Sequence, residues 1–202
     1  MKDYFLEKVV AHICDKFGHN ISEICIVLPN RRASLFLKKY FAAEIKKPFF
    51  APSIFSIEDF IAELASAPQA DDITLLFELY QTVKQLGNNK NETFDEFCKW
   101  GNILLRDFND IDNNLADAAQ LFGNLKNIKE LESWSLNEEG LTEFQKEYLR
   151  FYESLGKIYL DFQIRLKTKN ICYQGLAAKS VALNTLAASE KQTWQHIVFA
   201  GF

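Results

Sequence analysis

Hydrophobic positions recur with two different spacings in the first third of the chain. Over residues 2–17 they follow the spacing of one helical face, and Gly18 is a typical residue after a helix end. Residues 24–28, Ile-Cys-Ile-Val-Leu, are instead continuously apolar and rich in β-branched side chains, which predicts a strand buried on both faces. A helix is predicted next, over about residues 32–45, and then a short strand within residues 48–55.

From Ser66 onward the pattern changes to helices separated by polar turns. Two pairs of residues, Ser56 with Asp59 and Thr93 with Glu96, have the spacing of capping boxes that begin helices. The longest predicted helix repeats its apolar residues in steps of four and three, which indicates packing along a neighbouring helix in a bundle. The predicted helices cover residues 56–65, 71–86, 93–108, 115–128, 143–167 and 173–186, with an irregular stretch at 130–140.

The last apolar run, residues 197–202, predicts another buried strand. Because buried parallel strands need helical crossovers and sheet partners, we expect this run to join the two N-terminal strands in one small parallel sheet. The predicted fold class is α/β and predominantly helical. Residues 1–65 and 187–202 are expected to form a discontinuous α/β core, interrupted by a helical insertion of residues 66–186. Domains seldom end in an apolar strand, so we also expect an N-terminal fragment of a longer protein.

Composition is that of a globular protein. The chain is 48% hydrophobic and 25% charged, and no apolar run approaches the ~20 residues that a membrane-spanning helix needs. The N-terminus matches neither a signal peptide nor an Arg-rich transit peptide, so a cytoplasmic protein without membrane contact is expected. The four cysteines are scattered without a Cys-x-x-Cys pair, which favours buried reduced thiols and predicts no metal site.

Charge is distributed unevenly along the chain. Residues 31–57 hold six basic side chains and one acidic, whereas residues 58–143 hold eighteen acidic and six basic. The basic side chains form a stripe that begins at the start of a predicted helix, where backbone N–H groups favour anions. The candidate nucleic-acid contacts at this stripe are Asn30, Arg31, Arg32, Lys38 and Lys39. A solvated helix face of mixed charge explains the stripe equally well, and this alternative stays open here.

No complete catalytic constellation stands in the sequence. The junction between the first strand and the next helix, residues 28–34, lies where a phosphate-binding loop would be. It lacks that loop's glycines and its Gly-Lys-Ser/Thr ending, so no tight nucleotide binding and no cofactor are expected. An acidic cluster at residues 107–114 fails as an EF-hand, because leucines stand where the loop needs Gly and Glu. Asp112 and Asn114 are predicted instead to be turn and N-cap groups between two helices.

Several segments of the chain resemble the N-terminal part of AddB-type helicase–nuclease subunits, which belong with the PD-(D/E)xK nuclease family. They extend over essentially the whole chain, and none of them is a catalytic signature. The resembling segments are Ile-Val-Leu-Pro-Asn-Arg-Arg-Ala at 26–33, Ser-Ile-Phe-Ser-Ile-Glu-Asp-Phe at 53–60, residues 100–112 and Phe-Ala-Gly-Phe at 199–202.

The resemblance implies a helicase-like motor domain whose sheet is interrupted by a helical subdomain, with a degenerate P-loop at residues 30–34. It implies that the domain is non-catalytic and inactivated, and that it guides or binds DNA within a DNA repair and recombination exonuclease. DNA and a helicase–nuclease partner subunit are the implied partners, and the family's nuclease and metal-binding motifs lie outside this sequence. The alternative that stays open is a helical protein-interaction domain without nucleic-acid contact.

Overall fold

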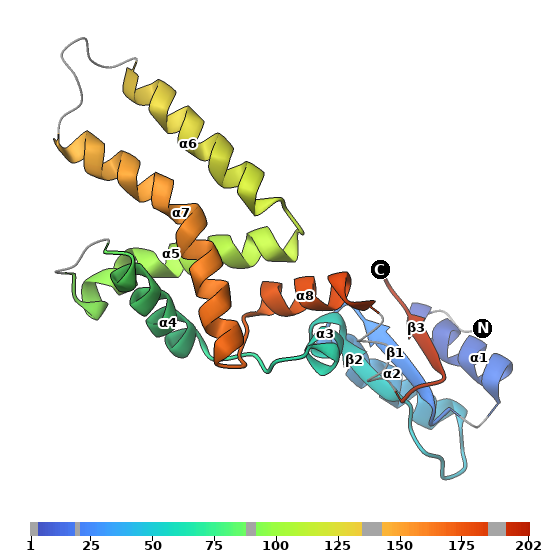
Figure 1. Cartoon of the computed structure of the whole chain (residues 1–202). Helices are drawn as coiled ribbons and strands as arrows, with labels where there is room; N and C mark the ends of the chain where they lie inside the picture. Colours follow the sequence, from blue (N-terminus) through green and yellow to red (C-terminus); the bar gives the residue numbers. More distant parts are fainter. Residues whose placement is uncertain (1–3, 19–20, 88–91, 135–142, 186–192) are drawn as a thin grey trace. The chain divides into compact units, whose positions relative to one another are not determined.

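The computed structural model of the chain describes residues 4–18, 21–87, 92–134, 143–185 and 193–202 (Figure 1). The chain divides into two compact units. The first comprises Met1–Ala65 and Asn184–Phe202, and the second comprises Ser66–Leu183. Helices predominate over one small parallel sheet, so the predicted α/β, mostly helical class is confirmed. Within the described ranges, no helix is both long and apolar enough to cross a lipid bilayer.

Three parallel strands in the order β2-β1-β3 form the sheet of the first unit. The central strand β1 (Ile24–Leu28) pairs with β2 (Ser53–Ser56) on one edge and with β3 (His196–Phe199) on the other. The register places Ile26 opposite Val198 of β3. All of β1 is buried, because it has a strand on each side and packed side chains on both faces. The expected pairing of N-terminal and C-terminal segments in one sheet is therefore confirmed. The expectation of a buried last strand over residues 197–202 was wrong, because β3 covers only residues 196–199 and is a half-exposed edge strand with β1 on one side alone among the described residues.

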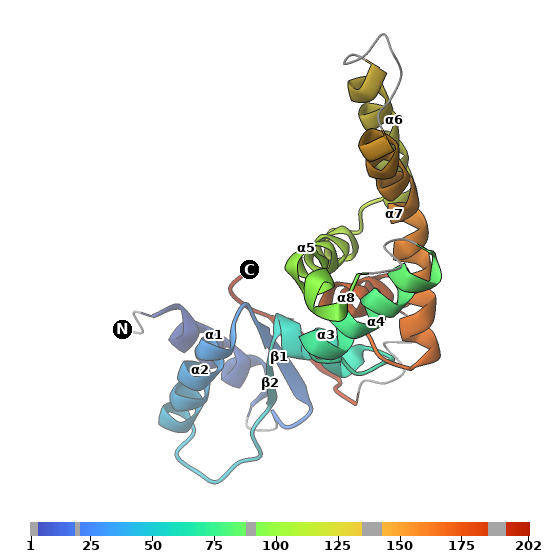
Figure 2. The same ribbon diagram turned by 90° about the vertical axis from the view of Figure 1, so that its left-hand side faces the viewer.

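Helices cover both faces of this sheet. Figure 2 shows α1 (Phe5–Phe17) and α2 (Arg31–Glu44) on one side of the strands and α3 (Ile57–Leu64) on the other. Alternate β1 side chains pack with apolar residues of α1 and α2, as the period of two in a strand requires. This core contains Val10, Ile13, Ile21, Ile24, Ile26, Leu28, Leu37, Phe41, Ile45 and Ala200.

Aromatic side chains cover the α3 face of the sheet. Trp194 packs edge-on against Phe55, with 5.6 Å between ring centroids, and donates its indole N–H to the hydroxyl of Ser53. Phe60 of α3 contacts Trp194 and packs edge-on against Phe199 of β3 at 5.9 Å. Aromatic pairs in such arrangements are more favourable than their buried area alone suggests. The cluster thus joins β3 to β2 across the central strand, although Ser53 and Trp194 are 141 residues apart in sequence.

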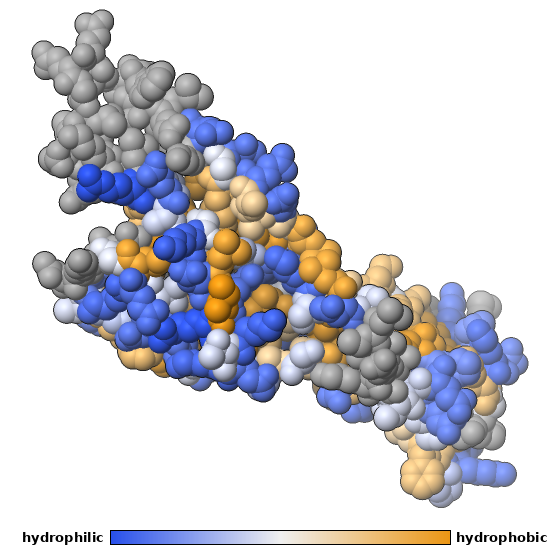
Figure 3. Space-filling model, in the orientation of Figure 1, coloured by the Kyte–Doolittle hydropathy of each residue, from blue (hydrophilic) through white to orange (hydrophobic). Residues whose placement is uncertain are grey.

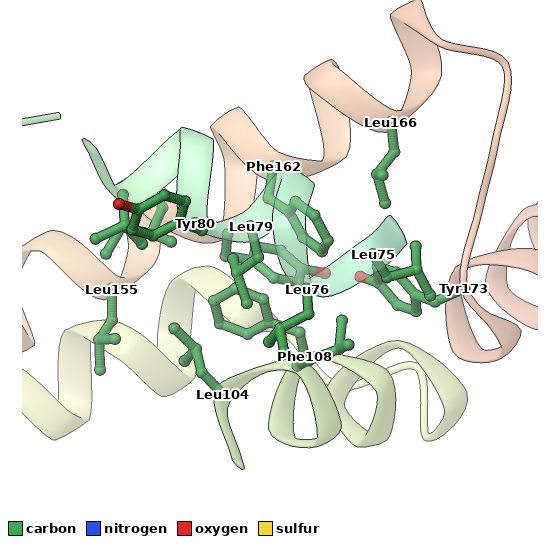
Figure 4. Packing of buried hydrophobic residues seen from close by; sticks show 14 of the residues in the cluster. Leu75, Leu76, Leu79, Tyr80, Leu104, Phe108, Leu155, Phe162, Leu166 and Tyr173 are labelled. Atoms are coloured by element: carbon green, nitrogen blue, oxygen red, sulfur yellow. The ribbon is translucent and has the colours of Figure 1, made fainter. Parts of the chain in front are cut away.

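The described part of the second unit is a bundle of five helices, whose apolar faces meet in one core (Figure 4). Phe108 and Phe162 are completely buried at its centre. The predicted capping box at the start of one helix is confirmed, because Thr93 and Glu96 each accept the other's backbone N–H. The helices are α4 (Asp72–Gln85), α5 (Phe94–Asn113), α6 (Ala118–Trp134), α7 (Glu143–Thr168) and α8 (Gln174–Leu183).

Some predicted boundaries were wrong. The second strand begins only at Ser53, because prolines at 48 and 52 lack the N–H that a ladder requires. Asn114 is the C-cap of α5, not the N-cap of the next helix, and Leu115 then turns the chain with a φ of 52°. Asp117 accepts the backbone N–H of Gln120 at the start of α6 instead. Helix α6 also continues to residue 134 through part of the predicted irregular stretch, whose residues 135–140 lie outside the described ones.

Candidate nucleic-acid interface

The turn from β1 into α2 is closed by its own polar side chains. Asn30 is the N-cap of α2, and its Oδ1 accepts the backbone N–H of Ala33 at 3.0 Å. The hydroxyl of Ser34 donates to the carbonyl of Arg31 at 2.6 Å. The Asn30 side chain thus accepts a backbone N–H group at the start of the helix. In a phosphate-binding turn, such an N–H group donates to the ligand instead. Asn30 therefore has a structural role that the sequence analysis had not assigned to it.

Arg31 forms an ion pair with Asp59 at the start of α3. Its Nε lies 3.0 Å from Oδ2 and its second terminal nitrogen lies 2.5 Å from Oδ1, which is a two-point contact. The hydroxyl of Ser56 donates to the same carboxylate at 2.7 Å. Hydrogen bonds from Arg31, and then from Ser56, lower the pKa of Asp59 to about 2. The pair connects the segments that follow β1 and β2, and it occupies one side of the Arg31 guanidinium.

The crevice between the ends of β1 and β3 is narrow. From β1 the chain first crosses to β2 on one side of β1, and later returns to β3 on its other side. In open α/β sheets, ligands bind where the strand order changes direction in this way, in the crevice outside the carboxyl ends of the strands. Gly201, two residues after the end of β3, has a φ of 90°, and a methyl group on it would lie 3.5 Å from the ring of Pro29. The proline ring, which lacks an N–H, therefore stands where a glycine-rich loop presents its amides to phosphate.

One face of α2 points into solvent and carries both charge and apolar area. Arg32 and Lys39 are seven residues apart, and Leu35 and Phe36 lie between them at helical spacing. Leu35 is 68% exposed and Phe36 is 48% exposed. We call these four residues the α2 face. Lys38 is also exposed, but it follows Arg31 by two helical turns and lies with it on the side of the helix next to the α2 face.

The two apolar members of the α2 face were missed by the sequence analysis. Leu37, Phe41 and Ile45 share another side of the helix at helical spacing, and they are buried. The same spacing puts Leu35 and Phe36 among the basic residues, so a helical projection of residues 31–45 would have revealed them. Exposed aromatic and basic side chains together are the chemistry that binds single nucleic-acid strands, through stacking and phosphate contacts.

The buried acidic groups of the second unit have structural partners. Asp112 is fully buried and is bound by the side chains of Tyr159, Tyr173, Gln163 and Lys179. Its predicted role as a turn group was wrong, because it lies in the last turn of α5 on the side that faces the core. Among the described residues, no group of three side chains is arranged to hold a metal ion.

No protein-family model matches the sequence, and no curated protein matches it closely enough to indicate common descent.

Proposed function

We propose that the chain is a non-catalytic, inactivated helicase-like domain that binds or guides DNA within a DNA repair and recombination exonuclease. The observation that carries this proposal is the α2 face. Arg32 and Lys39 stand on it without a carboxylate, and Leu35 and Phe36 add exposed apolar area between them. Of the residues predicted to contact nucleic acid, Arg32, Lys38 and Lys39 have no ion-pair partner among the described side chains, whereas Arg31 is bound to Asp59.

Two further features support the proposal. The segments that resemble AddB-type subunits include the β1–α2 turn, the β2–α3 turn and the end of β3, which all lie at the carboxyl edge of one sheet. The β1–α2 turn has a side-chain cap and an adjoining proline in place of a glycine-rich loop. Phosphate-loop chemistry needs those glycines, so a motor domain with this turn would serve as a scaffold and not as an ATPase.

A salt-dependent binding experiment tests the proposal. Fluorescence anisotropy of a labelled single-stranded oligonucleotide would be followed at about 50 mM and 200 mM salt, because phosphate contacts weaken as salt rises. Arg32→Ala/Lys39→Ala should reduce affinity and lower the slope of log affinity against log salt by about two. Lys8→Ala removes an exposed charge from another helix of the same unit, α1, and serves as the control. Equal affinity of the double variant and the unaltered chain would refute the proposed interface.

A second candidate function is a protein-interaction domain, favoured by apolar side chains on the bundle. Figure 3 shows an apolar strip over the second half of α7, where Leu160 is 57% exposed and Ile164 is 63% exposed. These residues are one helical turn apart and so form a continuous surface. If this function is correct, a partner should co-purify with the chain after nuclease treatment and should be lost from Leu160→Asp/Ile164→Asp. Retention of the partner by that variant would contradict it.

A further inference from the structure

A pocket of about 310 Å³ opens in the helical bundle of the second unit. Residues from the start of α4, the middle of α5 and the start of α8 line it. Its volume lies at the lower end of the ~300–1,000 Å³ typical of small-molecule sites. The pocket therefore suits a small metabolite and is too small for a folded partner.

The walls of the pocket are held together by close contacts. The backbone N–H of Gly175 donates to Asn109 Oδ1 at 2.7 Å, which attaches the first turn of α8 to α5. A methyl group on Gly175 would lie 2.2 Å from the carbonyl oxygen of Asn109, so the two helices touch. The segment before α4 is attached as well, because the N–H of Ala70 donates to the carbonyl of Cys172 at 3.0 Å. These contacts fix the walls of the pocket relative to one another.

Two opposite charges line the pocket without pairing. Asp72 belongs to the first turn of α4 and Arg106 to the middle of α5. Neither takes part in any ion pair between described residues, although both line the same space. A ligand with an anionic and a cationic group would satisfy both side chains, and charge-assisted hydrogen bonds are the strongest contacts available to it.

The remaining lining adds amide groups and an apolar wall. Asn102 donates its amide N–H to the carbonyl of Cys98, which leaves the oxygen of the same side chain for a ligand. Asn109 accepts from Gly175 and so retains its NH₂ donors. Leu75 and Leu105 supply the apolar part of the lining, and Figure 4 shows Leu75 beside Tyr173.

We propose that this pocket binds a free α-amino acid with an aliphatic side chain. The carboxylate of the ligand pairs with Arg106, its ammonium group pairs with Asp72, and its side chain packs against Leu75 and Leu105. This site belongs to the second unit, whereas the α2 face belongs to the first, so it does not depend on the proposed DNA binding.

Isothermal titration calorimetry of the whole 202-residue chain tests this proposal. L-leucine is the probe, N-acetyl-L-leucine lacks the ammonium group, and L-leucinamide lacks the carboxylate. Saturable binding of L-leucine is expected, with affinity lost for both derivatives. Absence of saturable binding, or equal binding of all three compounds, would overturn the proposal.

Substitutions then assign the binding to the pocket. Arg106→Gln and Asp72→Asn should each weaken L-leucine binding by about ten-fold or more, because each removes one charge-assisted contact. Lys99→Gln alters an exposed charge of α5 outside the pocket and should leave the affinity unchanged. Thermal unfolding of each variant checks that the bundle is intact, as expected for exposed positions. Undiminished binding by both pocket variants would overturn the assignment.

Discussion

Lys179 of α8 donates a hydrogen bond of 2.8 Å to the carboxylate of Asp112 in α5. Asp112 is completely buried, whereas the Lys179 side chain is 26% exposed. The same carboxylate accepts from the hydroxyls of Tyr159 and Tyr173 and from the amide of Gln163. One acidic group therefore connects α5, α7 and the segment that begins α8. Its charge is compensated inside the bundle, as a buried carboxylate requires.

Asp112→Ala should strongly destabilise the second unit. The substitution leaves the Lys179 ammonium group and two buried hydroxyls without their acceptor, and breaking a buried pair in this way costs about 3–5 kcal/mol. Urea denaturation followed by circular dichroism measures the change in the free energy of unfolding. Asp110→Ala changes an exposed carboxylate two residues away and should alter stability by less than about 0.5 kcal/mol. Similar effects of the two substitutions would contradict the role assigned to Asp112.

The same cluster predicts a loss of stability in alkali. Burial, and then the hydrogen bonds to Asp112, raise the pKa of Tyr159 and of Tyr173 above the ordinary value of 10.0. Burial alone would lower the pKa of Lys179, but its bonds to Asp112 and Tyr159 outweigh burial and raise it. Groups whose pKa is raised on folding stabilise the folded state below their ordinary pKa, and this contribution is lost as pH rises further.

The urea midpoint should therefore be level from pH 7 up to the ordinary tyrosine pKa of 10.0 and should fall as the pH rises above that value. Tyr173→Phe removes one titrating hydroxyl, so its midpoint should fall less steeply in this alkaline range. An identical alkaline decline in the unaltered chain and in Tyr173→Phe would show that this hydroxyl does not contribute.

A second ion-pair cluster predicts a loss of stability in acid. Glu78 is bound by Arg165 and Lys169, each at 2.5 Å. Burial alone would raise the pKa of Glu78, but hydrogen bonds from Lys169 and Arg165 outweigh burial and lower it below the ordinary 4.5. A lowered carboxyl pKa stabilises the folded state above the ordinary value, and this contribution is lost as pH falls through the lowered pKa.

Glu78→Gln should cost about 1–2 kcal/mol at pH 7, a modest figure because Lys169 is 47% exposed and solvent screens its charge. It should also make the free energy of unfolding less dependent on pH below 4.5, the ordinary pKa of this carboxyl. Urea titrations at pH 7 and in acid measure both effects. An unchanged acid dependence would assign the decline to other carboxylates.

Two glycines in the bundle should respond oppositely to alanine. Gly175→Ala places a methyl group 2.2 Å from the Asn109 carbonyl oxygen, so α8 must move away from α5, at a cost of about 1–3 kcal/mol. A methyl group on Gly123 in α6 meets nothing within 4 Å, so Gly123→Ala should stabilise the helix by up to about 1 kcal/mol. Thermal unfolding measures both changes. Equal shifts of the two melting temperatures would contradict the close contact between α5 and α8.

Most residues of the candidate interface could be predicted from the sequence, but the ion pairs that they form could not. Helical spacing separates the buried Leu37 from the exposed Arg32 and Lys39, because one helical face must meet the sheet. No local pattern shows that Arg31 is bound to Asp59, which is 28 residues away. The pocket in the helical bundle could not be foreseen either, because Asp72 and Arg106 line the same space only after α4 and α5 pack together.

The sequence by itself determined which segments are helices and which are strands, and that the terminal strands share a sheet, but not that β3 is a half-exposed edge strand. Helices and strands can be predicted from residues that are close together in sequence. The spacing of apolar residues shows which face of an element is buried, and capping residues mark where a helix begins. Only the tertiary structure decided whether each charged group is buried, paired or exposed. Whether Asp112 is buried or solvated, and whether Arg31 or Arg32 is available to a ligand, depends on side chains brought together from distant parts of the chain. Coulombic and hydrogen-bond energies depend on distances that only packing sets.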